Sequence, residues 1–252
     1  MNKQVKLGAG IFIVREDAAA DLETTLEKMA AIGYDGIELV GYFGRTAAEV
    51  KASLKAAGLL AIGDHVQAAD VIKEPKRVIG EHLDMGCAYI TLTFGEENVK
   101  NQLFDDIVEQ CKEAVSLCLA SGITPMYHNH AFDMQGENPF TERLLDAVAD
   151  LKFEPDVGWM LAAGQDPAYF LKKYKARIPV VHFKDVFVTE EGFTFRPTGY
   201  GNVNTPALLP LAVACNPDWL MVDHDLAYER DSYEDLKLCY DYMKNLLKIA
   251  GC

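Results

Sequence analysis

Histidines and carboxylates gather at the carboxyl ends of short apolar runs in this 252-residue chain. Five of the six histidines occupy such ends, and only His82 lies in a helical pattern. Imidazoles and carboxylates exchange protons near neutral pH and bind divalent metals. Scattered histidines would fall at least as often on surface helices, so this clustering indicates a chemical site. The polar residues at the run ends are Glu38, Asp64, His65, Tyr127, His128, Asn129, His130, Asp156, His182, Lys184, Asp185, Asp223, His224 and Asp225.

The spacing of residues within these runs predicts which of the polar side chains point in the same direction. Side chains of a strand alternate between two faces, so residues two apart point the same way. A ring of imidazoles and carboxylates from several strands suits Mn²⁺, Zn²⁺, Fe²⁺ or Co²⁺ better than Ca²⁺. Structural alternatives remain open, because Lys184 would also fit a salt bridge and His224 would also fit an outward position. The pairs expected to share a face are His128 with His130, His182 with Lys184, and Asp223 with Asp225.

Eight apolar runs alternate with helix-length amphipathic segments along the whole chain. The expected strands are Lys6–Val14, Gly36–Val40, Leu59–Val66, Tyr89–Phe94, Ile123–Asn129, Leu151–Val157, Pro179–Val186 and Trp219–Val222. The expected helices are Asp21–Ile32, Thr46–Ala57, Pro75–Met85, Asn101–Ala120, Pro139–Ala149, Pro167–Tyr174, Thr205–Ala214 and Ser232–Ile249. Strands separated by helices pair in parallel. Eight such units predict a single-domain (β/α)₈ TIM barrel spanning residues 1–252.

The main rival is a doubly wound open sheet. That fold usually has fewer strands and an early glycine-rich phosphate turn, and the sequence contains neither GxGxxG nor GxxxxGK[ST]. Helix boundaries are clearly marked. Thr46 and Glu49 have the spacing of a capping box, and Gly58 and Gly33 are typical helix stops.

Composition narrows the function classes. The formal net charge is −14, which argues against nucleic acid or an anionic membrane as the main partner. The six cysteines include no CxxC pair, so we expect reduced thiols and a cytoplasmic location. No segment approaches the ~20 apolar residues that span a bilayer, and the start of the chain lacks a signal-peptide cleavage pattern.

Several motifs together resemble the sugar phosphate isomerase/epimerase family, the xylose-isomerase-like TIM barrels. Each motif is weak alone, but their order and intervals are fairly specific, and the resemblance covers essentially the whole chain. It implies a metal held by four residues at the ends of the last four strands. The motifs are GYDGIELVGYFG, YHNHAFD, DVGWMLAAGQDP, VVHFKDV, GYGNVN and MVDHD.

Carried onto this chain, the resemblance implies His128, Asp156, His182 and Asp223 as the metal ligands. Relatives more often have Glu where this chain has Asp223, and the better-known epimerases have Glu where it has His128. Asp133 is a rival for the fourth ligand if its loop folds inward. We expect Mn²⁺, with Mg²⁺, Co²⁺, Zn²⁺ or Fe²⁺ as alternatives.

The family chemistry removes a proton next to a carbonyl, while the metal polarises the substrate oxygens. We expect His128 or His130 to be the base, Asp223 to be a ligand or a second acid/base group, and Lys184 to steady a substrate oxygen. The residues expected to bind substrate are Glu38, His65, Trp159, Lys184 and Arg196.

The expected activity is that of a sugar or keto-sugar isomerase or epimerase. A lyase that eliminates a β-leaving group from a keto-sugar, keto-inositol or oxidised glycoside is the main alternative. A non-catalytic barrel subunit and a phosphodiester-cleaving enzyme are minor ones. The expected substrate is small, sugar-like and unphosphorylated. We expect no nucleic-acid or membrane partner; a homo-oligomer or a partner subunit remains open.

Overall fold

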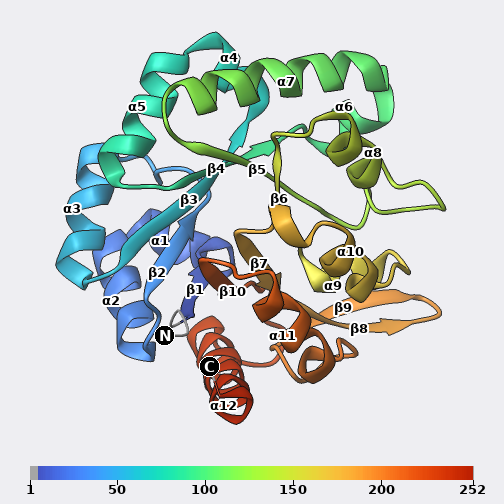
Figure 1. The fold of residues 1–252 in the computed structure, drawn as a ribbon. Helices are drawn as coiled ribbons and strands as arrows, with labels where there is room; N and C mark the ends of the chain where they lie inside the picture. The colour runs from blue at the N-terminus through green and yellow to red at the C-terminus, as the bar shows by residue number, and fades with distance from the viewer. Residues whose placement is uncertain (1–4, 252) are drawn as a thin grey trace.

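Eight parallel strands form the centre of the structure, a computed structural model that describes residues 5–251. They follow the order β6-β5-β4-β3-β2-β1-β10-β7 (Figure 1). The sheet closes between β6 and β7, where Asp156 bridges to His182 in parallel. The predicted TIM barrel is therefore confirmed. The barrel strands are β1 (Lys6–Gly10), β2 (Gly36–Leu39), β3 (Leu60–Gln67), β4 (Tyr89–Thr93), β5 (Thr124–His128), β6 (Lys152–Glu154), β7 (Val180–Phe183) and β10 (Trp219–Val222).

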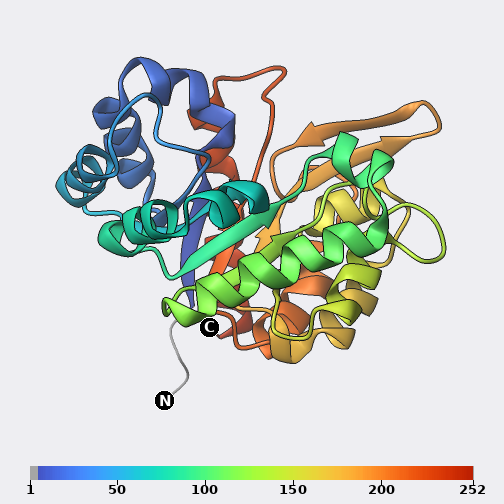
Figure 2. The ribbon, with the colours of Figure 1, turned by 90° about the horizontal axis from the view of Figure 1, so that it is seen from above.

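Helices surround the strands (Figures 1 and 2). The predicted capping box of Thr46 and Glu49 is present, and Gly33 and Gly58 end their helices in the left-handed conformation. The helices are α1 (Arg15–Ala20), α2 (Leu22–Ile32), α3 (Ala47–Ala57), α4 (Ala68–Lys73), α5 (Pro75–Met85), α6 (Glu96–Asn101), α7 (Phe104–Ala120), α8 (Phe140–Ala147), α9 (Val157–Ala162), α10 (Pro167–Lys173), α11 (Thr205–Ala214) and α12 (Ser232–Ala250), with 3₁₀ turns η1 (Phe12–Val14) and η2 (Lys175–Arg177).

Alternation along the strands separates two apolar cores. Side chains facing outward pack under the helices in a large cluster, while a small cluster lies apart from it. The small cluster consists of side chains that point into the barrel. Towards the carboxyl ends of the strands, the inward-pointing side chains are polar instead of apolar, so their polar groups face one another inside the barrel mouth. The small cluster consists of Ile62, Tyr89, Met126, Val180, Trp219 and Met221.

Several predicted boundaries are wrong. The first strand ends at Gly10 rather than at Val14, because Ile13 and Val14 are buried in a 3₁₀ turn. The sixth strand stops before Val157, because the Asp156 side chain accepts a hydrogen bond from Trp159 N and caps α9. Helices α1, α4, α6 and α9 were not predicted.

The sequence pattern also missed an antiparallel hairpin after the seventh barrel strand. It consists of β8 (Asp185–Thr189) and β9 (Gly192–Arg196), and it extends away from the barrel (Figure 2). The buried Asp185 carboxylate fastens the returning loop, because it accepts hydrogen bonds from the backbone N–H groups of Gly199, Gly201 and Val203 at 2.8–3.0 Å.

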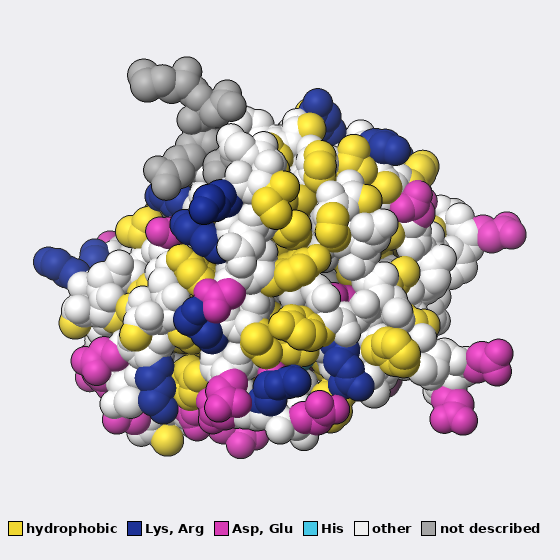
Figure 3. All heavy atoms as spheres, turned by 90° about the horizontal axis from the view of Figure 1, so that it is seen from below, with side chains coloured by type: hydrophobic (Ala, Val, Ile, Leu, Met, Phe, Trp, Pro, Cys, Tyr) yellow, Lys and Arg dark blue, Asp and Glu magenta, His cyan; other side chains and the backbone are white. Residues whose placement is uncertain are grey.

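Acidic and basic side chains are interspersed with apolar ones on the face shown in Figure 3. No continuous basic field covers the described residues on that face. Within residues 5–251, none of the helices has the length and apolar character needed to cross a membrane.

The Asp185 contacts give a stability prediction. Asp185→Ala leaves several buried backbone donors without an acceptor, so the free energy of unfolding should fall by about 2–4 kcal/mol. Asp166→Ala is the matched control, since Asp166 accepts one backbone hydrogen bond at the exposed start of α10. It should cost about 1 kcal/mol. Equal losses in urea denaturation would contradict the role given to Asp185.

Candidate metal and active site

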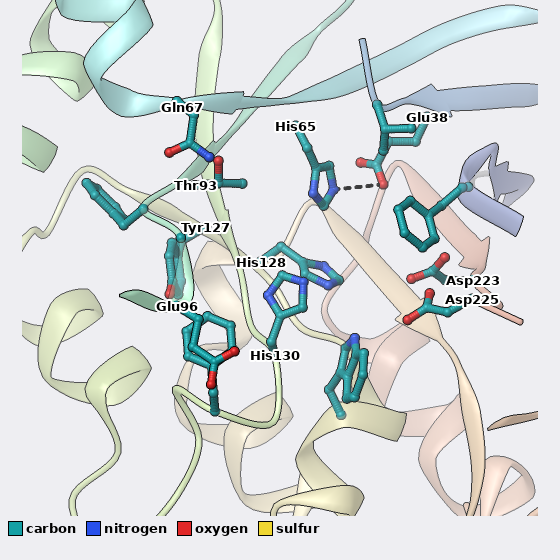
Figure 4. Close-up of a pocket in the computed structure, with 17 residues that line it drawn as sticks. Glu38, His65, Gln67, Thr93, Glu96, Tyr127, His128, His130, Asp223 and Asp225 are labelled. Atoms are coloured by element: carbon teal, nitrogen blue, oxygen red, sulfur yellow. Dashed lines mark hydrogen bonds and ion pairs between the residues drawn. The ribbon is translucent and has the colours of Figure 1, made fainter. Parts of the chain in front are cut away.

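A cavity of about 430 Å³ opens at the carboxyl ends of the barrel strands. Figure 4 places three histidines in its middle, with Glu38, Asp223 and Asp225 on one side. Gly10 leaves the room for this arrangement, because a Cβ there would lie 2.8 Å from Asp223 Oδ1. The cavity is lined by Gly10, Phe12, Glu38, Val40, His65, Gln67, Thr93, Phe94, Gly95, Glu96, Tyr127, His128, His130, Phe132, Trp159, Asp223 and Asp225.

Four buried side chains meet beside this cavity, and two of them, His128 and Asp223, line it. His128, Asp156, His182 and Asp223 each offer one ligand atom, and these atoms all lie within 4.8 Å of one another. His182 Nδ1 is 3.3 Å from Asp223 Oδ2, and His128 Nε2 is 4.0 Å from Asp156 Oδ2. These are the four residues that the family resemblance implied as ligands. The shorter Asp223 side chain reaches the group without the extra methylene of Glu.

The chemistry of this quartet fits a divalent metal. Two imidazole nitrogens and two carboxylate oxygens form a mixed donor set typical of first-row transition metals. Asp156 Oδ2 is buried and has no hydrogen-bond partner among the described residues. The His182 ring presents Nδ1 to Asp223 and its other nitrogen, Nε2, to two further carboxylates. Nε2 lies 3.1 Å from Glu38 Oε2 and 3.3 Å from Glu154 Oε1. Such carboxylates orient a ligating histidine.

Lys184 contributes a fully buried ammonium beside the quartet. Its Nζ donates to Asp223 Oδ2 at 2.7 Å and to Asp225 Oδ1 at 2.5 Å, and lies 3.6 Å from Asp156 Oδ2. Burial raises the pKa of Asp156 to about 7, although Lys184 opposes this shift. Burial also acts to raise the pKa of Asp223, but Lys184 and His182 hold it well below its ordinary value.

Glu38 and His65 form a second pair, which lines the cavity. His65 Nε2 donates to Glu38 Oε2 at 3.1 Å. Burial alone would lower the pKa of His65, but the Glu38 carboxylate raises it to about 9. The same contact, together with His182, lowers the pKa of Glu38 in spite of its burial.

His128 and His130 have the opposite protonation state. Burial holds the pKa of His128 well below its ordinary value, and the neighbouring histidines add to this effect. Burial and the charges of His65 and Lys184 lower the pKa of His130 to about 3. The cavity wall therefore combines a protonated imidazole at His65 with a neutral one at His130.

Sequence reasoning missed Glu154. It is fully buried, its Oε2 accepts a hydrogen bond from Thr91 Oγ1 at 3.0 Å, and it lies 3.7 Å from His128 Nδ1. Burial, followed by the charge of Glu38, raises its pKa to about 7. A signal was available, because Glu154 stands two residues before Asp156 and so shares its face of the strand.

Some predicted residues lie elsewhere. Lys184 and Arg196 are not among the residues that line the cavity, and Arg196 donates to the Phe195 carbonyl. Both Asp133 carboxylate oxygens are engaged, one by Tyr127 Oη at 2.6 Å and one by His130 N at 2.9 Å.

Two strand-end residues face outward, away from the cavity. The Asp64 carboxylate lies 3.3 Å from His82 Nε2 and accepts a hydrogen bond from Gly41 N. His224 Nε2 lies 3.1 Å from Asp235 Oδ2 on α12.

Trp159, by contrast, lines the cavity, and the rings of Phe193 and Phe195 lie nearly perpendicular to its ring.

Carboxylates and histidines at the carboxyl ends of TIM-barrel strands define the protein as a barrel of the enzyme type, whose active sites lie at that face. Residues 26–242 match the family described as "Xylose isomerase-like TIM barrel", and the chain belongs to this family. The predicted family is therefore confirmed.

The individual relatives and solved structures that resemble this chain share low sequence identity with it. The chain is 27% identical over 191 residues to inosose dehydratase of Geobacillus kaustophilus (strain HTA426). The matched region covers 65% of this chain and 62% of the relative. The chain thus matches less than two thirds of that relative's length. A sugar phosphate isomerase/epimerase from Parabacteroides distasonis ATCC 8503 has a TM-score of 0.78 at 21% identity, over 95% of this chain and 98% of that one. A xylose isomerase-like TIM barrel protein from Mycobacterium smegmatis, in complex with magnesium, has a TM-score of 0.75 at 14% identity, over 98% of both chains.

The quartet predicts a specific pattern of metal affinity. Asp156→Asn should weaken Mn²⁺ binding by more than about a hundredfold, because even outer-shell changes cost 10–100-fold. Asp133→Asn is the control and should bind Mn²⁺ like the unaltered protein, since both Asp133 oxygens are engaged elsewhere. Isothermal titration with Mn²⁺ measures both affinities. Loss of binding in Asp133→Asn, with binding retained in Asp156→Asn, would make Asp133 the ligand instead.

Proposed function

We propose that this protein is a metal-dependent lyase that dehydrates a keto-polyol. The observation that carries the proposal is geometric: two of the four potential metal ligands, His128 and Asp223, line the same cavity as His65 and His130. The likeness to a protein named inosose dehydratase supports elimination over the isomerisation expected from sequence. When bound, a divalent cation such as Mn²⁺ would supply Lewis-acid polarisation of the substrate's oxygens.

His130 and His65 divide the proton transfers. His130 is neutral, which is the form that a base requires, and it faces the cavity. His65 is protonated, and its Nε2 is engaged by Glu38, so Nδ1 is the atom that would meet the substrate. Two groups whose environments drive their pKa values apart make an acid and a base.

The elimination balances with these two groups. His130 takes the proton from the carbon next to the carbonyl, the electron pair of that C–H bond forms a double bond to the β carbon, and the bond between the β carbon and its oxygen breaks. The electron pair leaves with that oxygen, which takes a proton from His65 and departs as water. Lys184 contributes by holding Asp223 and Asp225 in place, since its ammonium is buried behind them.

An isomerase or epimerase is the second candidate. It shares the first proton abstraction and differs only in returning a proton to carbon. Two imidazoles facing one cavity also permit that return, and a structural neighbour is named sugar phosphate isomerase/epimerase.

Reaction in D₂O separates these outcomes. With Mn²⁺ and an inosose, we expect proton exchange next to the carbonyl together with the ultraviolet absorbance of an unsaturated ketone. His130→Ala should slow exchange by about 10²–10⁴-fold. His82→Gln should leave the exchange rate unchanged, because His82 lies outside the cavity, against Asp64. Exchange without the absorbance would favour the epimerase, and unchanged exchange in His130→Ala would contradict the assigned base.

A further inference from the structure

The cavity extends well beyond the metal quartet. Its strand-end carboxylates lie on one side, and a second region lies across the three histidines, over the ends of β3, β4 and β5 (Figure 4). We call this second region the outer compartment. A cavity of about 430 Å³ falls within the range that encloses drug-sized ligands, which are larger than one sugar ring. The outer compartment is lined by Gln67, Thr93, Glu96 and Tyr127, with Phe94 beside Tyr127 and Phe132 against His130.

The outer compartment has the lining of a site for a neutral hydroxylated ring. Gln67 and Thr93 provide an amide and a hydroxyl, which both donate and accept hydrogen bonds. Phe132 stacks on His130 with ring centroids 5.4 Å apart and planes 15° apart. This stacking fixes the ring as a flat apolar surface. Aromatic walls with a few placed polar groups are typical of small-molecule sites.

Charge in the cavity disfavours a phosphorylated substrate. None of the lining side chains among residues 5–251 is a lysine or an arginine, whereas Glu38, Glu96, Asp223 and Asp225 are acidic. The buried Lys184 ammonium is already bound by two carboxylates. The protonated His65 imidazole is the one cationic side chain on the described wall of the cavity, and its Nε2 is already paired with Glu38, so a phosphate group would meet an acidic wall with no unpaired ammonium or guanidinium to receive it.

We propose that the substrate is an uncharged glycoside, with one ring beside the metal quartet and a second sugar ring in the outer compartment. This substrate class rests on the proposed function for the reacting ring alone. The second ring needs only the outer compartment, so its binding is measurable without turnover.

Binding of unreactive sugars to the Mn²⁺-loaded protein tests this proposal. We expect at least one disaccharide from a panel of mixed linkages to bind at least ~10-fold more tightly than glucose, and glucose 6-phosphate to bind no more tightly than glucose. Phe132→Ala should remove the disaccharide's advantage and leave glucose binding unchanged. Phe187→Ala is the control, because that exposed ring lies on the hairpin outside the cavity.

Three results would overturn the proposal: equal affinity for glucose and every disaccharide, tighter binding of glucose 6-phosphate, or equal weakening of both sugars by Phe132→Ala. None of these depends on catalysis. Failure of the proposed function shows itself separately, as absence of the unsaturated-ketone absorbance when an inosose reacts in D₂O.

Discussion

The buried carboxylates of the candidate metal site and the cavity are stable because each of them faces an ammonium or an imidazole. An isolated ionised carboxylate inside a protein is very costly, so such groups are paired or coordinate metals. Lys184 and His182 provide most of this compensation. Lys184 contacts Asp156, Asp223 and Asp225, while His182 stands between Asp223 on one side and Glu38 and Glu154 on the other.

The compensation around Lys184 is incomplete. Three carboxylates share one ammonium, which leaves an acidic excess beside the cavity, where the quartet lies. The orphaned Asp156 Oδ2 is the atom where this excess is least satisfied. A divalent cation offsets such an excess directly. The same acidic excess accounts for the buried lysine and for the fit of the quartet to a metal, while burial is the main cause of the raised pKa of Asp156.

The barrel was predictable because its sequence pattern repeats at two scales, the strand–helix unit and the alternation of side chains within each strand. Eight repeats of strand and helix, and the two-residue alternation in each strand, place His128, His182 and Asp223 on one inward face without any knowledge of contacts. The hairpin β8–β9 was not predictable in this way, because its apolar residues continue a run that also reads as barrel strand. Glu154 was missed because only Asp156 was placed at the end of the expected strand Leu151–Val157, although Glu154 stands on the same face two residues earlier.

Contacts made by long side chains were the least predictable part of the site. The position of Lys184 in sequence places it at a strand end, but only the fold shows that its ammonium turns to Asp223 and Asp225 rather than to the cavity. Arg196 was expected to bind substrate. Its guanidinium instead lies by Tyr228, 6.0 Å from the ring centre.

The central claim is that the quartet binds a divalent metal. Anomalous diffraction at the manganese edge, from crystals grown with Mn²⁺, tests it most directly. The account predicts one strong peak within coordination distance of His128, Asp156, His182 and Asp223. The absence of a peak there, or a peak among Glu38, Glu154 and His182, which form a second potential ligand group, would contradict it.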